Sequence, residues 1–187
     1  MHGAARVRYR VRQFARTAAA AVSPLSTSEE AEARRRLSGA TWPLFAVMPR
    51  GDQRHSLRVL RTLEAGGRRH PALVQAALLH DCAKGEGSIR LWHRVAVVLI
   101  KATRPGMMAR WAALPPPGPA DWRRPFWLHA NHPERGALLA AAHGCDPLTV
   151  ALIRWHHGAP GRAAPGEREI PGLPGSLAEL RRADDDN

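Results

Sequence analysis

The run PALVQAALLHDCAK, residues 71 to 84, constrains the fold of this chain more than any other stretch. A proline at its start suits the first position of an α-helix, and between Pro71 and His80 only Gln75 is polar. A helix that is apolar on every side has to be covered on every side. The run therefore predicts a buried central helix that ends at His80, with the rest of the chain packed around it.

The rest of the chain also carries helix signals rather than strand signals. β-branched residues are few, period-two alternation is slight, and no Asn-Gly hairpin turn occurs. Capping boxes and proline or aspartate starts instead predict helices. One expected helix starts at Ser26 or Thr27, and another is opened by Ser176 with Glu179 and covers residues 177–184. The others are expected over residues 5–21, 52–63, 88–103 with a further helix to 114, 132–143 and 147–156. The sequence thus predicts an all-α fold, a compact multi-helix bundle. Residues 1–37 are expected to form a basic helical N-terminal extension to a domain of residues 38–187.

The chain of 187 residues has a formal net charge of +12 at pH 7, which suits a nucleic-acid or phosphate partner. The basic residues are nearly all arginines, since only Lys84 and Lys101 are lysines, and such a composition can reflect a GC-rich genome. The arginines are scattered and lack the interleaved aromatic residues of a single-strand platform. We therefore do not predict nucleic-acid binding and favour a small phosphorylated substrate as the partner.

Two cysteines, Cys82 and Cys145, do not form a CxxC pair. We therefore predict neither a disulfide framework nor a zinc-thiolate site, and a reducing compartment fits. The longest strongly apolar run, residues 95–100, is too short to span a bilayer, and the basic N-terminus lacks the apolar core of a signal peptide. We expect a cytoplasmic protein without a transmembrane segment, and the sequence predicts no oligomeric state.

His80 and Asp81 fall in the last turn of the central helix, where backbone carbonyls favour a bound cation. Imidazole and carboxylate are both good ligands for divalent first-row metals. Taken alone, these two residues suit a packed histidine and a solvated aspartate slightly better than a metal site. The weighting changes because further histidines and an aspartate stand at apolar helix faces or helix ends: His55, His132, His156 and Asp184.

Together these residues give the order His, His-Asp, His, His, Asp in a small helical chain. Metal binding is the chemistry that such a set of ligands has in common. Two alternatives stay open, because neighbours of the same type adjoin two of the candidates. His157 can replace His156, and Asp185 or Asp186 can replace Asp184.

This order resembles the HD-domain metal-dependent phosphohydrolase superfamily over residues 51 to 187. RHSLRVLRTL is similar to the first-histidine helix of that family, and AALLHDCAK to its His-Asp element with the trailing lysine. NHPERGALLAAAHGCDPLTVALIRWHH resembles the segment that supplies two further histidines in the two-metal branch, and LAELRRADDDN the closing aspartate helix. That branch includes small bacterial hydrolases such as the symmetrical diadenosine tetraphosphate hydrolases.

The resemblance implies a set of roles. A first metal ion is held by His55, His80, Asp81 and Asp184, and Asp81 bridges to a second ion held by His132 and His156. Asp81 and Lys84 are catalytic, with Lys84 contacting a substrate phosphate. The implied cofactor is one or two divalent ions (Fe, Mn, or Mg or Zn), and residues 38–187 form the HD domain. Two such ions lower the pKa of a water held between them and neutralise phosphate oxygens during attack.

The implied activity is hydrolysis of a nucleotide or of another phosphate ester or anhydride. One alternative is a single-metal nucleotidase in which His132 and His156 bind phosphate. Another is a catalytically weak HD fold that serves as a nucleotide-sensing or interaction module. One feature is unusual for a ligand, since Asp184 lies three residues from the C-terminus, where chains fray. We therefore predict that the metal itself orders residues 181–187.

Overall fold

The described residues of the computed structural model are 23–86, 93, 96, 97, 100, 103, 105–157 and 170–187. They form α2 (Thr27–Arg34), α3 (Trp42–Ala46), α4 (Arg50–Ala65), α5 (Pro71–Leu79), a short 3-10 helix η1 (Cys82–Glu86), α7 (Pro105–Ala112), α8 (Arg124–Ala142), α9 (Pro147–Trp155) and α10 (Leu173–Asp185). No strand occurs among the described residues, so the all-α prediction is confirmed. Within the same part of the chain, no helix is both long and apolar enough to cross a membrane.

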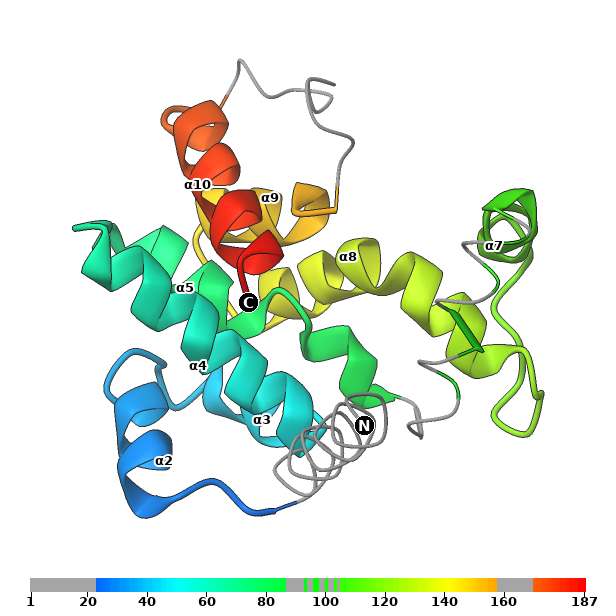
Figure 1. Ribbon diagram of the computed structural model, residues 1–187, viewed down its shortest axis with the longest axis horizontal. Coiled ribbons are helices and arrows are strands. Elements are labelled where there is room, and N and C mark those ends of the chain that lie inside the picture. Colours follow the sequence, from blue (N-terminus) through cyan, green and yellow to red (C-terminus); the bar gives the residue numbers. More distant parts are fainter. Residues whose placement is uncertain are drawn as a thin grey trace, which may run out of the picture.

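Helix α5 lies at the centre of these elements, as its apolar sequence predicts. Seven of its nine residues are buried, and it packs against α3, α4, α9 and α10 (Figure 1). Pro71 opens the helix and His80 is its C-cap residue. Because α5 is covered along its length, the two polar residues that follow it, His80 and Asp81, are carried into the interior, where they are 1% and 2% exposed.

Helix α8 runs past the end of α5 and links two parts of the molecule. One end packs against α9 and η1, and the other packs against α7 (Figure 1). The predicted start of this helix at residue 132 is wrong, because α8 begins at Arg124 and Pro133 lies inside it. Phe126, Trp127 and Leu128 are buried, and their packing offsets the backbone hydrogen bond that an internal proline removes.

Two predicted helix starts are confirmed by their hydrogen bonds. Ser26 and Glu29 form a reciprocal capping box at α2, and the Asp146 carboxylate accepts from the backbone of Leu148 at 2.8 Å to cap α9. Two others are wrong. The N-cap of α4 is Pro49 rather than Asp52. Helix α10 begins at Leu173, ahead of the expected Ser176 box, because the fully buried Leu173 docks the first turn on the core.

Residues 23–37 contact α4. Ala33 and Leu37 belong to the main hydrophobic core, and Arg36 pairs with Glu64 at 2.8 Å. The boundary predicted at residue 37 stays a prediction. The predicted helix over residues 5–21 lies outside the described residues, and so does most of the one over 88–103.

Candidate metal centre

All six predicted metal ligands converge on one place, from five elements of the chain. His55 comes from α4, His80 and Asp81 from the end of α5, His132 from α8, His156 from the end of α9 and Asp184 from the last turn of α10. In the first half of the cluster, His55 Nε2 lies 2.7 Å from Asp184 Oδ1. His80 Nε2 lies 3.6 Å from the same oxygen and 3.7 Å from Asp81 Oδ2.

Asp81 connects this half of the cluster to a second half. Its other oxygen, Oδ1, lies 3.2 Å from His132 Nε2 and 3.9 Å from His156 Nε2. The two Nε2 atoms of His132 and His156 are 3.3 Å apart. One carboxylate therefore faces imidazole nitrogens with both of its oxygens, Oδ2 toward His80 and Oδ1 toward His132 and His156.

The orientation of three imidazoles is fixed by the same backbone device. In each ring Nδ1 lies within hydrogen-bonding distance of the carbonyl three residues earlier: His80 with Ala77 at 3.0 Å, His132 with His129 at 2.7 Å, and His156 with Ile153 at 2.7 Å. A carbonyl oxygen only accepts, so the ring proton sits on Nδ1 and the Nε2 lone pair points into the cluster. Metal-ligating histidines are held in this way by their second nitrogen.

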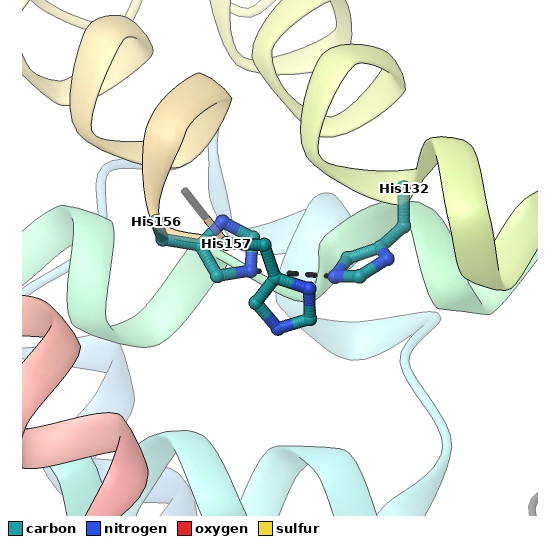
Figure 2. Close-up of side chains that lie close together, drawn as sticks. All are labelled: His132, His156 and His157. Atoms are coloured by element: carbon teal, nitrogen blue, oxygen red, sulfur yellow. Dashed lines mark hydrogen bonds between the residues drawn. The ribbon is translucent and has the colours of Figure 1, made fainter. Parts of the chain in front are cut away.

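This tautomer leaves acceptors facing acceptors. The Nε2 atoms of His132 and His156, each with its lone pair toward the other, are 3.3 Å apart. Figure 2 shows the two rings turned toward each other with His157 beside them. His80 Nε2 and Asp81 Oδ1 are buried and have no hydrogen-bond partner among the described residues. Buried acceptors without a donor are costly, and a cation removes that cost.

The donor set therefore fits a divalent cation. Ligand atoms lie within 4.8 Å of one another in three groups of the described residues: His55 with His80 and Asp81, His80 with His156 and Asp184, and His132 with His156 and His157. Imidazole nitrogen with carboxylate oxygen suits Zn, Fe, Mn and their neighbours. His55 differs from the other histidines, because its Nε2 donates to Asp184, and a bound ion takes the place of that proton.

Burial and neighbouring charges prepare these groups to bind metal. Burial is the largest cause that lowers the pKa of His132 and of His156, so both imidazoles are neutral at pH 7. Burial opposes the ionisation of Asp81, but the Lys84 ammonium beside it acts in the other direction, and the pKa of Asp81 is held well below its usual range. Burial also opposes the ionisation of Asp184, but the hydrogen bond from His55 acts against it, and the pKa of Asp184 is lowered. Neutral imidazoles and ionised carboxylates are the forms that ligate.

Lys84, the predicted phosphate contact, is placed at the same centre by η1. Its ammonium lies 2.6 Å from Asp81 Oδ2, and its side chain is largely buried. The sequence pattern gave no sign of this ion pair. The pairing follows from the 3-10 turn, in which Lys84 lies three residues after Asp81 and returns to the same side.

Both neighbouring histidines at the end of α9 reach the cluster. His156 is 3% exposed and faces Asp81, whereas the His157 side chain is 40% exposed and its Nε2 lies 4.0 Å from Asp184 Oδ2. His156 is therefore the interior member and His157 the member at the rim. Among the aspartates at the chain's end, Asp184 faces the cluster while Asp185 and Asp186 are exposed.

The last turn of α10 has partners within the chain. The Arg181 guanidinium donates to the carbonyl of Trp155 at 2.6 Å, and the Asn187 amide donates to Thr62 Oγ1 at 2.9 Å. Leu180 and Ala183 are buried against the core. The prediction that the metal orders residues 181–187 overlooked these contacts, because side-chain bonds to distant backbone atoms leave no local sequence pattern.

Comparison with protein-family models, with curated proteins and with solved structures gives no match for this chain. The chemistry of the cluster therefore has to be inferred from its own residues. Two of its features matter most for that purpose. One is the carboxylate of Asp81, shared between two sets of nitrogens, and the other is the ammonium of Lys84 beside it.

Proposed function

We propose that this protein is a metal-dependent phosphohydrolase of the HD-domain type, acting on a nucleotide or on another phosphate ester or anhydride. The observation that carries the proposal is the position of Asp81. One buried carboxylate lies between oriented imidazoles on both sides, 3.7 Å from His80 Nε2 and 3.2 Å from His132 Nε2. An aspartate in that position suits two neighbouring ions that share a ligand.

The roles of the remaining residues follow from their places in the cluster. His55, His80, Asp81 and Asp184 form the first ligand set, and His132 and His156 with Asp81 form the second. Divalent ions at such a site supply activation of water and neutralisation of phosphate charge. The protein supplies the orientation, because each Nδ1–carbonyl bond keeps a lone pair directed inward. Burial of His80, His132 and His156 keeps bulk water from competing for the ligands.

Lys84 is the group that we assign to the substrate phosphate. Its ammonium is held 2.6 Å from Asp81 Oδ2, which places a positive charge beside the ligand cluster. An ammonium donates strong charge-assisted hydrogen bonds to phosphate oxygens and, while protonated, does not ligate metal. Cations bound by Asp81 would share its charge, and the Lys84 ammonium would then be available to contact an anionic substrate.

The open side of the cluster is where a substrate phosphate can approach. His157, with a 40% exposed side chain, lies on this side, and the side chains of His55 and Asp184 keep 21% and 16% of their surface. The other members are covered by α5, α8 and α9. The partner that we propose is a small phosphorylated substrate that reaches the cluster from the side on which His157 is exposed.

The test starts from full-length protein purified without chelator. Its metal content is measured by elemental analysis, and its turnover is assayed on nucleotides, dinucleoside polyphosphates, cyclic dinucleotides and simple phosphate esters. We expect divalent metal in the protein and phosphate or nucleotide release that EDTA abolishes and Mn or Fe restores. Metal-loaded protein that turns over none of these compounds would overturn the hydrolase proposal and favour the nucleotide-sensing module instead.

A further inference from the structure

The end of helix α9 is completed by side chains. The last carbonyls of any α-helix lack partners within the helix. Here the Ile153 carbonyl accepts from the His156 ring at 2.7 Å. The Trp155 carbonyl accepts from Arg181 Nη2 at 2.6 Å and from Nε at 3.2 Å, and the His156 carbonyl accepts from the same Nε at 3.3 Å. The turn that carries His156 and His157 is thus held by one guanidinium from α10.

The same helix supplies a ligand to the cluster. Arg181 lies three residues before Asp184, so both side chains project from neighbouring turns of one face of α10. Asp184 reaches His55 on α4 at 2.7 Å, while Arg181 reaches the end of α9. Helix α10 therefore ties α4 to α9, and with them the ligands that each helix contributes.

The chemistry of arginine suits this position. A positive charge at a helix C-terminus is favourable, because the carbonyls there carry partial negative charge. The planar guanidinium donates to two carbonyls in a fixed geometry, which the flexible ammonium of a lysine does not reproduce. The contact therefore fixes the direction of the α9 end as well as its distance from α10.

We propose that Arg181 is a positioning residue of the metal centre, which sets the place of the His156–His157 turn relative to Asp184. The inference rests on the proposed function, since it takes the cluster as a metal site. It goes further in naming a residue that contacts the backbone of Trp155 and His156 rather than the side chain of a ligand. The ligand group that depends on it is His80 with His156 and Asp184, which combines α9 and α10.

The test compares two arginines that anchor the same helix at different points. Arg181→Met removes the contact with α9. Arg181→Lys keeps the positive charge but not the planar guanidinium that donates from two nitrogens. Arg68→Met is the matched control, because Arg68 pairs with Glu179 on α10 at 2.6 Å and does not contact α9 in any bond that we describe. Mn²⁺ and Co²⁺ affinities are measured by calorimetry on the full chain, Co²⁺ absorption bands report the ligand set, and melting in chelator reports stability.

We expect Arg181→Met to bind metal about 10- to 100-fold more weakly and to change the Co²⁺ bands, as loss of an outer-shell partner does. Arg181→Lys should recover part of the affinity, and Arg68→Met should lose stability without losing affinity. Wild-type affinity in Arg181→Met, or an equal loss in Arg68→Met, would overturn the positioning role alone. A wild-type chain that takes up no metal would overturn the proposed function and this role together.

Discussion

Helices α5 and α9 are built alike and end alike. Each has nine residues, each begins with a proline, and each has a histidine as its C-cap residue. The cap backbones are almost the same, with φ −56° and ψ −29° at His80 and φ −56° and ψ −31° at His156. In both, Nδ1 bonds to the carbonyl three residues earlier, and the two rings meet with centroids 5.0 Å apart.

The residues that follow the two histidines differ, and burial explains the difference. Seven of nine residues are buried in α5 and five of nine in α9. His80 is followed by the buried Asp81, which has the Lys84 ammonium at 2.6 Å. His156 is followed by the half-exposed His157. A buried carboxylate needs an adjacent cation, whereas neutral imidazoles do not. The charged pair, Asp81 with Lys84, is therefore at the end of α5.

A third helix shows that the capping device alone does not make a site. His143 is the C-cap residue of α8, and its Nδ1 bonds to the Leu139 carbonyl at 2.9 Å, yet it lies outside every ligand group of the described residues. What distinguishes His80 and His156 is that a common carboxylate faces both rings. His143 is consequently the natural control for changes at either of the other helix ends.

The largest effect should come from exchanging both polar residues at one helix end. We expect His80→Ala with Asp81→Ala to leave almost no metal on the protein, because Asp81 faces both halves of the cluster and the group that remains, His132 with His156 and His157, has no carboxylate. His156→Ala with His157→Ala should retain one ion on His55, His80 and Asp81. Elemental analysis after desalting measures the metal content of both variants. The control His143→Ala should keep the metal content of the wild type. Full metal content in a folded His80–Asp81 double variant would show that the site assignment is wrong.

The next effect concerns the end of the chain. Asp184→Asn should weaken metal binding about 10-fold or more and remove nearly all activity, while the helical core stays folded. Asp186→Asn is the control, because Asp186 is exposed and faces away. Removal of residues 183–187 should act more strongly, since Ala183 is also buried. Hydrogen exchange with and without metal should show added protection in the last turn. Normal metal content in Asp184→Asn would show that Asp184 pairs with His55 but is not a metal ligand.

A smaller effect, on substrate binding, should distinguish the basic side chains near the two helix ends, Lys84 and Arg154. Lys84→Ala should raise KM for a phosphate substrate several-fold more than it weakens metal binding, because in the proposed function the ammonium contacts phosphate and does not ligate metal. Arg154→Ala is the matched change near the end of α9, where Arg154 pairs with Glu134 at 2.9 Å on the surface, and it should leave KM unchanged. Steady-state kinetics and calorimetry measure the two quantities separately. An equal rise of KM in both variants would remove the specific role of Lys84.

Much of the arrangement of the candidate ligands could be predicted from the sequence, because the family resemblance named the set and several of its members stand where local patterns are strong. His80 and Asp81 end an apolar run that has to be buried, and the aspartate–proline start of α9 fixes the turn at which His156 falls. The resemblance favoured His156 over His157, and the structure places His156 in the interior and His157 at the rim. Adjacent residues differ by 100° around a helix, and sequence alone does not say which side the neighbouring helices cover.

Contacts between distant segments could not be predicted. The Arg181 bonds to the end of α9 join positions 25 and 26 residues apart and depend on how α10 crosses α9. The start of α8 was missed because Pro133 reads as a helix start, while the packing of Phe126 and Leu128 extends the helix through it. Tertiary packing overrides local preference in both cases.

The smallest expected effect is a pH dependence that distinguishes the two helix ends in chelator-treated protein. At the end of α9, burial is the largest cause of two pKa shifts. It lowers the pKa of His156 well below its usual value and that of His157 to about 4. Unfolded histidines take up protons below about pH 6.5. Between that pH and the folded pKa values, the unfolded state binds more protons, so these residues stabilise the fold fully above pH 6.5 and progressively less as pH falls.

Asp81, at the end of α5, also makes the fold less stable as pH falls, but over a lower pH range. The pKa of Asp81 is held well below its ordinary value of 3.8, so the contribution of Asp81 to stability is present above pH 3.8 and is lost only in stronger acid. We expect His157→Gln to flatten the decline of melting temperature between pH 6.5 and 4, and Asp81→Asn to change its slope only below that range. The shift should be a few degrees, because His157 is partly exposed and solvent screens it. A melting temperature independent of pH between 6.5 and 4 in the metal-free protein would show that the α9 imidazoles are not held neutral by burial.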